Sequence, residues 1–502
     1  MFQVEHVTFF IVGLLVYIGL MVAIGYYFSR GKYAGRNFFT GGAKLPFFLI
    51  FATIAATLIG TGSAIGATAN GFRIGWGGSA FGLGAAIGLI LMMFLVRKTT
   101  PRSKGFLTMA EEAQYLFKGS VAIKNVTGVM MFVISVVWLG NHINGGGTLL
   151  AFVTGLDPIT ARFITTLGFA AYVMIAGYLA VVYTDTIQIC LLVGGFIIIV
   201  LTAIPAAGGW AEITSTIEAA GRGGNLTFYG VGTTGWMSFI ALVFAVGFPI
   251  IATPTYRMRI YTSANDKIAE KSFLTSAALM LGFSLFPALI GMAAFTMATN
   301  NNVTGVLENP DFAFAFVATQ ILGPILGLFF LIVGLTASMS SGDSDAIAGT
   351  TILLQDVYPS ITGKYLPDNK VVFWSRIAVL FTLACAFIST LGAQDIMAFI
   401  RNVVGAVVPG VSVAMLLGAL WKRVTWQGGL AAILSGTGFG VAFLSVPAVG
   451  AWVRATFTAP AIPAAIIALV FGLVFSFCTE CKPMSHEDRM AAVIASRGAR
   501  QE

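Results

Sequence analysis

The fold of this chain is decided by the stretch Leu335-Thr336-Ala337-Ser338-Met339-Ser340-Ser341-Gly342-Asp343-Ser344-Asp345, inside an apolar run from about 322 to 354. An ionisable side chain at the centre of a bilayer costs about 3 kcal/mol, so acids at that depth are candidates for a functional role. Ala337, Ser340, Ser341 and Ser344 are spaced as i, i+3, i+4 and i+7, which places them on one face of a helix. Hard cations prefer oxygen ligands, so the stretch predicts a cation site within a membrane helix. The alternative is that the serines bond to carbonyls of their own helix and the aspartates lie in a wet crevice.

The composition around this stretch is that of a membrane protein. The 502 residues are 57% hydrophobic and 10% charged, with a mean hydropathy of +0.90, which excludes an ordinary soluble globular protein. A spanning helix needs about 20 predominantly apolar residues. The windows that meet this requirement are 7–29, 46–69, 75–96, 126–152, 160–178, 184–204, 236–256, 272–298, 322–355, 371–392, 396–421, 427–446 and 460–478. The first has no small-residue cleavage site, so we expect it to be retained as a lead-in helix.

The placement of Lys and Arg predicts the orientation. With the N-terminus outside, the inner segments hold 23 of the 28 basic residues, as the positive-inside rule requires. We therefore expect a multi-pass protein of a plasma membrane of the bacterial inner-membrane type, with a cytoplasmic C-terminus. The net charge of +8 then describes inner loops beside anionic lipid and gives no indication of nucleic-acid binding. No soluble stretch is long enough for a core of its own, so 1–502 is expected to form a single membrane transport domain.

Two of the spans contain residues that break helices. Window 46–69 carries Gly60, Gly62 and Gly66, and window 236–256 carries Gly247-Phe248-Pro249, with Pro254 shortly after. Irregular backbone in mid-membrane persists only where it is buried or lines a wet cavity. Paired interruptions in corresponding helices are the best sequence indication of a transporter's binding site. The alternative is close helix packing through small residues.

Further polar residues lie within or beside the spans. Asp185 is expected to open the helix of window 184–204, either in a functional role or as a helix cap, a role that Thr184 fills equally well. His142, near Trp138 in window 126–152, can be a solute contact, a hydrogen-bonded structural residue or a proton carrier. Arg401 lies near the outer end of its window, where its side chain can reach the interface.

Together these motifs resemble the sodium:solute symporter family, which includes bacterial proline, pantothenate and sugar symporters and the high-affinity choline transporter. The resemblance begins at Asn37-Phe38-Phe39-Thr40-Gly41-Gly42 and ends at Trp421-Lys422-Arg423. Between them lie Gly177-Tyr178-Leu179-Ala180-Val181 with Thr184-Asp185 and Gln188, and Ser340-Ser341-Gly342-Asp343-Ser344 followed by Gln355-Asp356-Val357-Tyr358. The order and spacing of these motifs are more specific than any one of them.

The resemblance implies an all-α integral membrane protein of about 13 transmembrane helices. Its fold would be an inverted five-helix repeat of the leucine-transporter type, with helices 1 and 6 broken. The parts would be the lead-in helix 7–29, a first repeat 46–204, a second repeat 236–421, peripheral helices 427–478 and a cytoplasmic tail 479–502.

The resemblance also implies site residues. In relatives, sodium lies between helices 1 and 8, so its ligands here would be the carbonyls of Ala56, Ile59 and Ala337 and the hydroxyls of Ser340 and Ser341. Some relatives bind another sodium lower down, at positions that correspond to Asp185, Asp343 and Ser344. The solute is expected in mid-membrane, in contact with Ser63, Trp138, His142 and Phe248. Asp345 is not part of the shared pattern, and it could join a cation site or replace sodium coupling by proton coupling.

The function predicted is a sodium-coupled symporter that imports a small organic solute by alternating access, with sodium co-transported. The alternative is a proton-coupled transporter of the same fold that uses Asp343, Asp345 or His142. A channel is less favoured because no repeated filter loop is present, and an enzyme because only His142 of three histidines lies in a span with no nucleophile–base constellation. The solute, the ion stoichiometry and the oligomeric state do not follow from the sequence.

Overall fold

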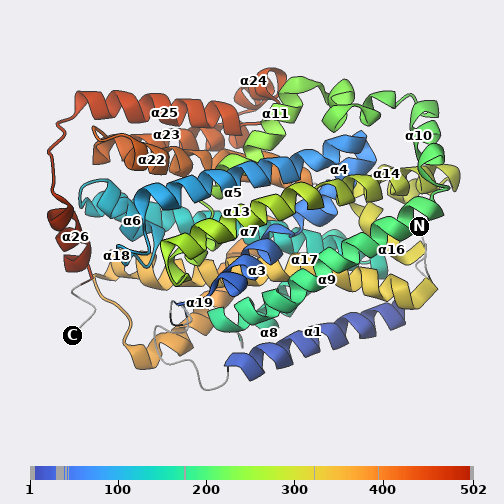
Figure 1. Cartoon of the computed structure of the whole chain (residues 1–502), viewed down its shortest axis with the longest axis horizontal. Helices are drawn as coiled ribbons and strands as arrows, with labels where there is room; N and C mark the ends of the chain where they lie inside the picture. The colour runs from blue at the N-terminus through green and yellow to red at the C-terminus, as the bar shows by residue number, and fades with distance from the viewer. Residues whose placement is uncertain are drawn as a thin grey trace.

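The structure is a computed structural model that describes residues 6–29, 39, 42, 44–174, 177–320, 323–393 and 395–497. Most of the first family-like motif, at 37–42, therefore lies outside the described residues. The described residues form a bundle in which most long helices run roughly along the longest axis (Figure 1). Among them ten helical segments are long and apolar enough to cross a membrane, or eleven if the bent pair Ile396–Val407 and Pro409–Leu420 is one span. The predicted all-α membrane fold is confirmed.

The first repeat begins with a broken helix. Its helices are α3 (Phe47–Leu58), the π-turn η1 (Gly62–Gly66), α4 (Ala67–Ile74), α5 (Ala80–Thr99), α7 (Val121–Thr154), α8 (Pro158–Val173) and α9 (Tyr178–Ala206). All thirteen predicted windows contain helix. The helices α3 of window 46–69 and α8 of window 160–178 are not among the ten or eleven spans, because α3 stops after 12 residues and α8 has only 16.

The second repeat also has its break at the expected helix. It comprises α11 (Val231–Ile250), α12 (Pro254–Thr262), α13 (Asp266–Phe283), α14 (Leu285–Asn300), α17 (Gly323–Ile352), α19 (Asp368–Ser389), α20 (Ile396–Phe399), the π-turn η7 (Ile400–Val404) and α22 (Pro409–Leu420). Pro249 lies inside α11, and Pro254 opens α12 after extended backbone at Thr253. Proline supplies no amide donor, so Pro249 weakens the last turn of α11, which ends one residue later, and Pro254 is tolerated in the first turn of α12.

The remaining helices surround the repeats. The helix α1 (Val7–Ser29) lies along one side, and α23 (Trp426–Ser445) and α25 (Ala461–Cys478) lie on the opposite side (Figure 1). The short helix α10 (Trp210–Ala219) is at one end of the bundle, whereas α6 (Met109–Leu116), α18 (Tyr358–Thr362) and α26 (His486–Ala495) are at the other. The sequence assigns these two ends to opposite sides of the membrane. Outward-facing apolar residues such as Leu201, which is 67% exposed, fit a hydrocarbon solvent.

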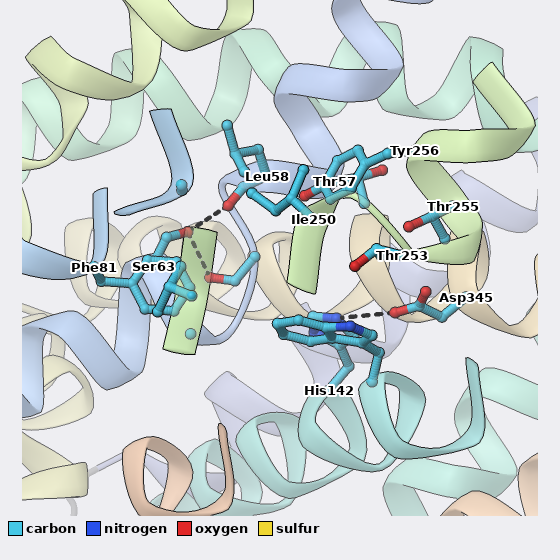
Figure 2. A pocket seen from close by; sticks show the side chains of 15 residues that line it. Thr57, Leu58, Ser63, Phe81, His142, Ile250, Thr253, Thr255, Tyr256 and Asp345 are labelled. Atoms are coloured by element: carbon cyan, nitrogen blue, oxygen red, sulfur yellow. Dashed lines mark hydrogen bonds and ion pairs between the residues drawn. The ribbon is translucent and has the colours of Figure 1, made fainter. Parts of the chain in front are cut away.

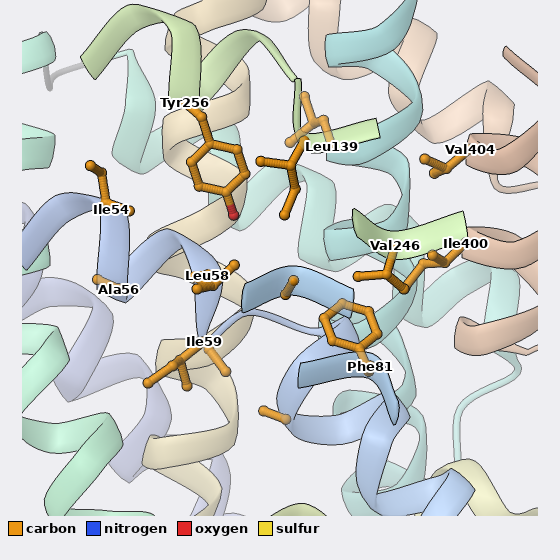
Figure 3. Close-up of a cluster of buried hydrophobic side chains, with 14 of the residues drawn as sticks. Ile54, Ala56, Leu58, Ile59, Phe81, Leu139, Val246, Tyr256, Ile400 and Val404 are labelled. Carbon is orange, nitrogen blue, oxygen red and sulfur yellow. The ribbon is translucent and has the colours of Figure 1, made fainter. Parts of the chain in front are cut away.

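An apolar shell encloses the break in the first helix. Five buried side chains from four elements, α3, α5, α11 and η7, converge there (Figure 3): Ile54, Leu58, Phe81, Val246 and Ile400. This packing supplies the buried environment that irregular backbone needs at membrane depth.

A backbone clasp joins the two broken helices at the same end of the bundle. Leu45, just before α3, donates its amide to the Thr262 carbonyl at 3.0 Å and accepts from the Ala264 amide at 3.0 Å. The result is an isolated parallel bridge between Leu45 and Ser263, and no strand forms in the part of the chain that the structure describes.

Candidate ion and solute sites

The break after α3 leaves carbonyl oxygens that the helix cannot satisfy, as at any helix end. Hydroxyls of α17 meet them: Ser340 donates to the Ala56 carbonyl at 3.0 Å, and Ser341 donates to the Thr57 carbonyl at 2.8 Å. Ser341 also lies 3.3 Å from the Ala337 carbonyl. Five uncharged oxygens from two helices therefore meet at one buried place, which is the ligand chemistry that suits a monovalent hard cation.

This contact brings together most of the predicted sodium ligands. Ala56, Ala337, Ser340 and Ser341 meet there, and Ile59 is fully buried at the break itself, where it leaves helical geometry with φ −81° and ψ 61°. Gly60 permits the close approach, because a Cβ atom there would lie 2.3 Å from the Ser341 Oγ.

A small cavity of about 40 Å³ lies beside the break (Figure 2). Its walls come from α3, η1, α5, α7, α11, α12 and α17, and they include the predicted solute contacts Ser63, Trp138 and His142. Phe248 does not line it: that ring stacks on Phe244 with centroids 4.7 Å apart and faces a separate apolar cavity beside α22 and α25. The face of α11 that meets the cavity carries Val246 and Ile250 instead.

A chain of polar side chains begins at His142 and Asp345 in the wall of this cavity and continues behind it. His142 places its Nε2 3.3 Å from the Asp345 Oδ2 and its Nδ1 3.1 Å from the Thr61 hydroxyl, which is 3.0 Å from the Ser338 hydroxyl. All four residues are buried. The chain ties α7 to the first-helix break and to α17.

A buried guanidinium lies where the second sodium was expected. Arg259 of α12 places its Nη2 3.6 Å from the Asp185 Oδ2, 2.6 Å from the Ser344 Oγ, 2.8 Å from the Thr53 Oγ1 and 3.1 Å from the Thr57 Oγ1. Thr53 also donates to Asp185. One arginine thus links α12 to α3, α9 and α17, with its side chain fully buried.

The position of Asp185 corrects one expectation. The sequence interpretation placed it at the opening of its helix, but α9 begins at Tyr178 after the capping residue Gly177, so Asp185 lies two turns inside and is fully buried. A cap role is excluded. Asp343 is also buried, and neither of its carboxylate oxygens has a hydrogen-bond partner among the described residues.

A second charged cluster lies at the C-terminal end of α4. Arg73 lies 3.4 Å from Asp311 and 3.9 Å from Asp395, and the Asp311 Oδ2 accepts the Ile396 amide at 3.0 Å. Asp311 sits in the loop before α16 (Ala313–Gln320), outside the spans. Burial raises the pKa of its carboxyl, and the Arg73 charge opposes that rise. Arg401 is exposed in η7, as expected for a side chain that reaches the interface.

The residues that sequence interpretation missed are Thr53, Thr57 and Thr61 on the first helix and Thr255, Tyr256 and Arg259 on α12. The three threonines repeat every four residues, which is the same one-face signal that the α17 serines gave.

Two broken helices, an oxygen-lined contact between α3 and α17 and a small cavity beside that contact are the features of a cation-coupled membrane transporter. The sequence profile of the sodium:solute symporter family matches residues 38–436. The chain belongs to that family; it is a sodium-coupled symporter, a multi-pass membrane protein and not an enzyme, and sodium is its co-transported ion.

The relatives include two from Bacillus subtilis. The osmoregulated proline transporter OpuE is 23% identical over 469 residues, which are 91% of this chain and 92% of OpuE. The high-affinity proline transporter PutP is 23% identical over 62% of this chain, and the match spans 64% of PutP. Among solved structures, a substrate-bound, outward-open Na⁺-coupled sialic acid symporter superposes with a TM-score of 0.74 at 18% identity, over 95% of this chain and 99% of that one. This likeness confirms the leucine-transporter-type fold.

Proposed function

We propose that this symporter imports a small organic solute by alternating access, with sodium bound between the first-helix break and α17. The observation that carries the proposal is the meeting of the Ser340 and Ser341 hydroxyls with the Ala56 and Thr57 carbonyls. The named solutes of the relatives, proline and sialic acid, are small organic molecules. We also propose the part boundaries given above, an outside N-terminus and a cytoplasmic C-terminus.

Sodium at this place would hold the first-helix break and α17 together, and these two elements would have to separate during transport. Its ligands come from α3 and from α17, so its binding energy depends on their separation. An ion shifts a conformational equilibrium only by its different affinity for the two states. Sodium would therefore favour the arrangement in which the break and α17 are in contact.

Two charged clusters have the geometry of gates. Arg73 joins α4 to the Asp311 loop and to the segment before α20, on the side assigned to the outside. Arg259 joins α12 to α3, α9 and α17, on the side assigned to the cytoplasm. The Arg73 cluster would have to separate for the cavity to open to the outside, and the Arg259 cluster would have to separate for it to open to the cytoplasm.

We propose that Asp185, Asp343 and Ser344 receive sodium on its way inward. Because the Arg259 guanidinium contacts Asp185 and Ser344, an ion would meet these oxygens fully only after the arginine moves. Two like charges cannot share one dry cluster at low cost. Arrival of the ion and opening of the inner gate would thus be one event.

The test is the sodium dependence of thermal unfolding of the purified protein in a constant potassium background, with Ser340→Ala plus Ser341→Ala as the variant. A ligand that binds only the folded state raises the midpoint in a concentration-dependent way. We expect a saturable rise in the wild type that the double variant lacks. Ser276→Ala, which changes another buried serine on α13, is the matched control.

An equal sodium response in wild type and double variant would refute the ion site. A response to pH with none to sodium would favour proton coupling through Asp343, Asp345 or His142.

A further inference from the structure

We propose that a basic cavity at the end of the bundle assigned to the cytoplasm binds the phosphate headgroup of an anionic phospholipid, and that an adjoining apolar groove takes one of its acyl chains. The headgroup cavity has a volume of about 490 Å³ and lies among α6, α26 and the end of α22 (Figure 1). This volume is in the range usual for small-molecule sites. The site shares no described lining residue with the cavity beside the first-helix break, and so it goes beyond the proposed function.

The headgroup cavity is lined by positive charge. Five basic side chains face it and, among the described residues, no acidic one does: Lys98, Lys104, Lys118, Lys422 and Arg489. They come from α5, from the segments that follow α5, α6 and α22, and from α26. None of the five forms an ion pair with another described residue. A cleft lined by charges of one sign concentrates the opposite ion, so this cavity favours an anion.

Two buried acids near Lys104 already have other partners. Glu112 accepts from the Arg257 guanidinium at 3.2 Å, and Asp266 accepts two backbone amides of the loop after α5 at 2.9 Å. Burial lowers the pKa of Lys104, and the charges of Glu112 and Asp266 act in the opposite direction. A cation whose charged form is disfavoured by burial is stabilised by an anion placed beside it.

Contacts among the lining residues hold three of the cations in position. The Lys104 Nζ lies 5.4 Å and the Arg489 Cζ 5.8 Å from the centroid of the Tyr115 ring, and the Lys118 Nζ lies 2.6 Å from the Cys481 Sγ. Cation–π contacts of this kind orient a charge without neutralising it. An ammonium has three donors and a guanidinium five, so N–H groups remain for phosphate oxygens.

An apolar groove of about 380 Å³ adjoins the headgroup cavity, and Leu420 and Trp421 line both. Its remaining walls come from α11, α22 and α25, and every described side chain in them is hydrophobic. Ile466 and Leu469 of this groove are exposed, so it opens toward the hydrocarbon. Basic pockets on the cytoplasmic side of membrane proteins bind lipid headgroups. A soluble phosphate would leave the groove empty, whereas a phospholipid fills both parts.

The test is stabilisation of the purified full chain in detergent by dioleoyl phosphatidylglycerol. Dioleoyl phosphatidylcholine has the same chains without net charge, and sn-glycerol 3-phosphate has the phosphate without chains. We expect phosphatidylglycerol to bind at least tenfold more tightly than either. Because Arg489 and Met484 line the cavity, it should also slow amide exchange in α26.

Two triple variants locate the binding. One replaces three lining lysines and should lose at least tenfold in affinity for phosphatidylglycerol: Lys98→Gln, Lys118→Gln and Lys422→Gln. The control removes the same charge from three exposed lysines that do not line the cavity, and it should bind like the wild type: Lys267→Gln, Lys364→Gln and Lys370→Gln.

Equal binding of the two lipids, or equal affinities of the two triple variants, would overturn the inference. Binding of sn-glycerol 3-phosphate as tight as that of phosphatidylglycerol would assign the cavity to a soluble phosphate and overturn the lipid. The comparison of the two lipids and the exchange in α26 need no variant, so they decide even if the lining variant does not fold. Neither readout uses sodium, so a failure here is distinguishable from a failure of the proposed function.

Discussion

Replacing Gly60 by alanine tests the proposed sodium contact most directly, because it changes none of the proposed ligands. The added Cβ would lie 2.3 Å from the Ser341 Oγ and 3.1 Å from the His142 Cε1. To reach ordinary contact, the hydroxyl must move by about 1 Å, which takes its 2.8 Å bond to the Thr57 carbonyl out of hydrogen-bond range. A buried polar partner lost in this way costs about 1–3 kcal/mol. If displacement of the Ser341 hydroxyl costs the bound ion a ligand of similar energy, sodium affinity is expected to fall by about 5- to 150-fold.

The assay is a sodium titration of the unfolding midpoint at constant total salt. Gly282→Ala is the control: it makes the same change in helix α13, at an exposed position with no heavy atom within 4 Å of the new Cβ. That variant should titrate like the wild type. A sodium midpoint for Gly60→Ala within twofold of the wild-type value would show that Ser341 is not a ligand in this geometry.

The other predictions concern the gates and the tail. Arg259→Met leaves the buried Asp185 carboxylate unpaired, so the free energy of unfolding should drop by about 3–5 kcal/mol. The control Arg401→Met, at an exposed position, should change it by less than about 0.5 kcal/mol. Equal unfolding midpoints for the two variants would contradict the ion pair between Arg259 and Asp185. Burial raises the pKa of Asp311 in the closed outer cluster, while a hydrated carboxyl titrates near its ordinary value of about 3.9. Because acid favours the state with the higher pKa, lowering the pH through that window should slow amide exchange in α20, and Asp311→Asn should abolish the effect. Arg497 bonds the buried Glu111 at 2.9 Å, so Arg497→Ala should weaken the docking of α26 by about 2 kcal/mol and speed limited proteolysis of the tail; an unchanged cleavage rate would show that other contacts hold α26.

The contact between α17 and the first-helix break could be predicted from the sequence because both of its partners carry local signals. The serine spacing identifies one face of α17, and Gly60 with its neighbouring glycines marks the break that frees the carbonyls. Both signals lie within about ten residues, so a single helix or break is enough to reveal them. The family resemblance then paired the two helices, which spacing alone cannot do.

The inner cluster could not be predicted in the same way. Counting basic residues assigned Arg259 to an inner loop, because the short α12 follows two prolines and reads as a helix end. Its role depends on oxygens from three other helices, and no local pattern contains them. The placement of Phe248 could not be predicted for a related reason. The break was located correctly, but the packing of neighbouring helices decides which side of α11 faces the cavity, and Phe248 lies on another side.

The clasp between Leu45 and the end of α12 has a mechanical consequence. It fastens α3, which carries the carbonyls that meet Ser340 and Ser341, to the short helix that carries Thr255 and Tyr256 of the cavity beside the break. Neither piece can swing away alone without breaking two backbone hydrogen bonds. The two pieces are therefore expected to move together, so that in the proposed mechanism the ion and the solute would leave their sites in the same conformational step.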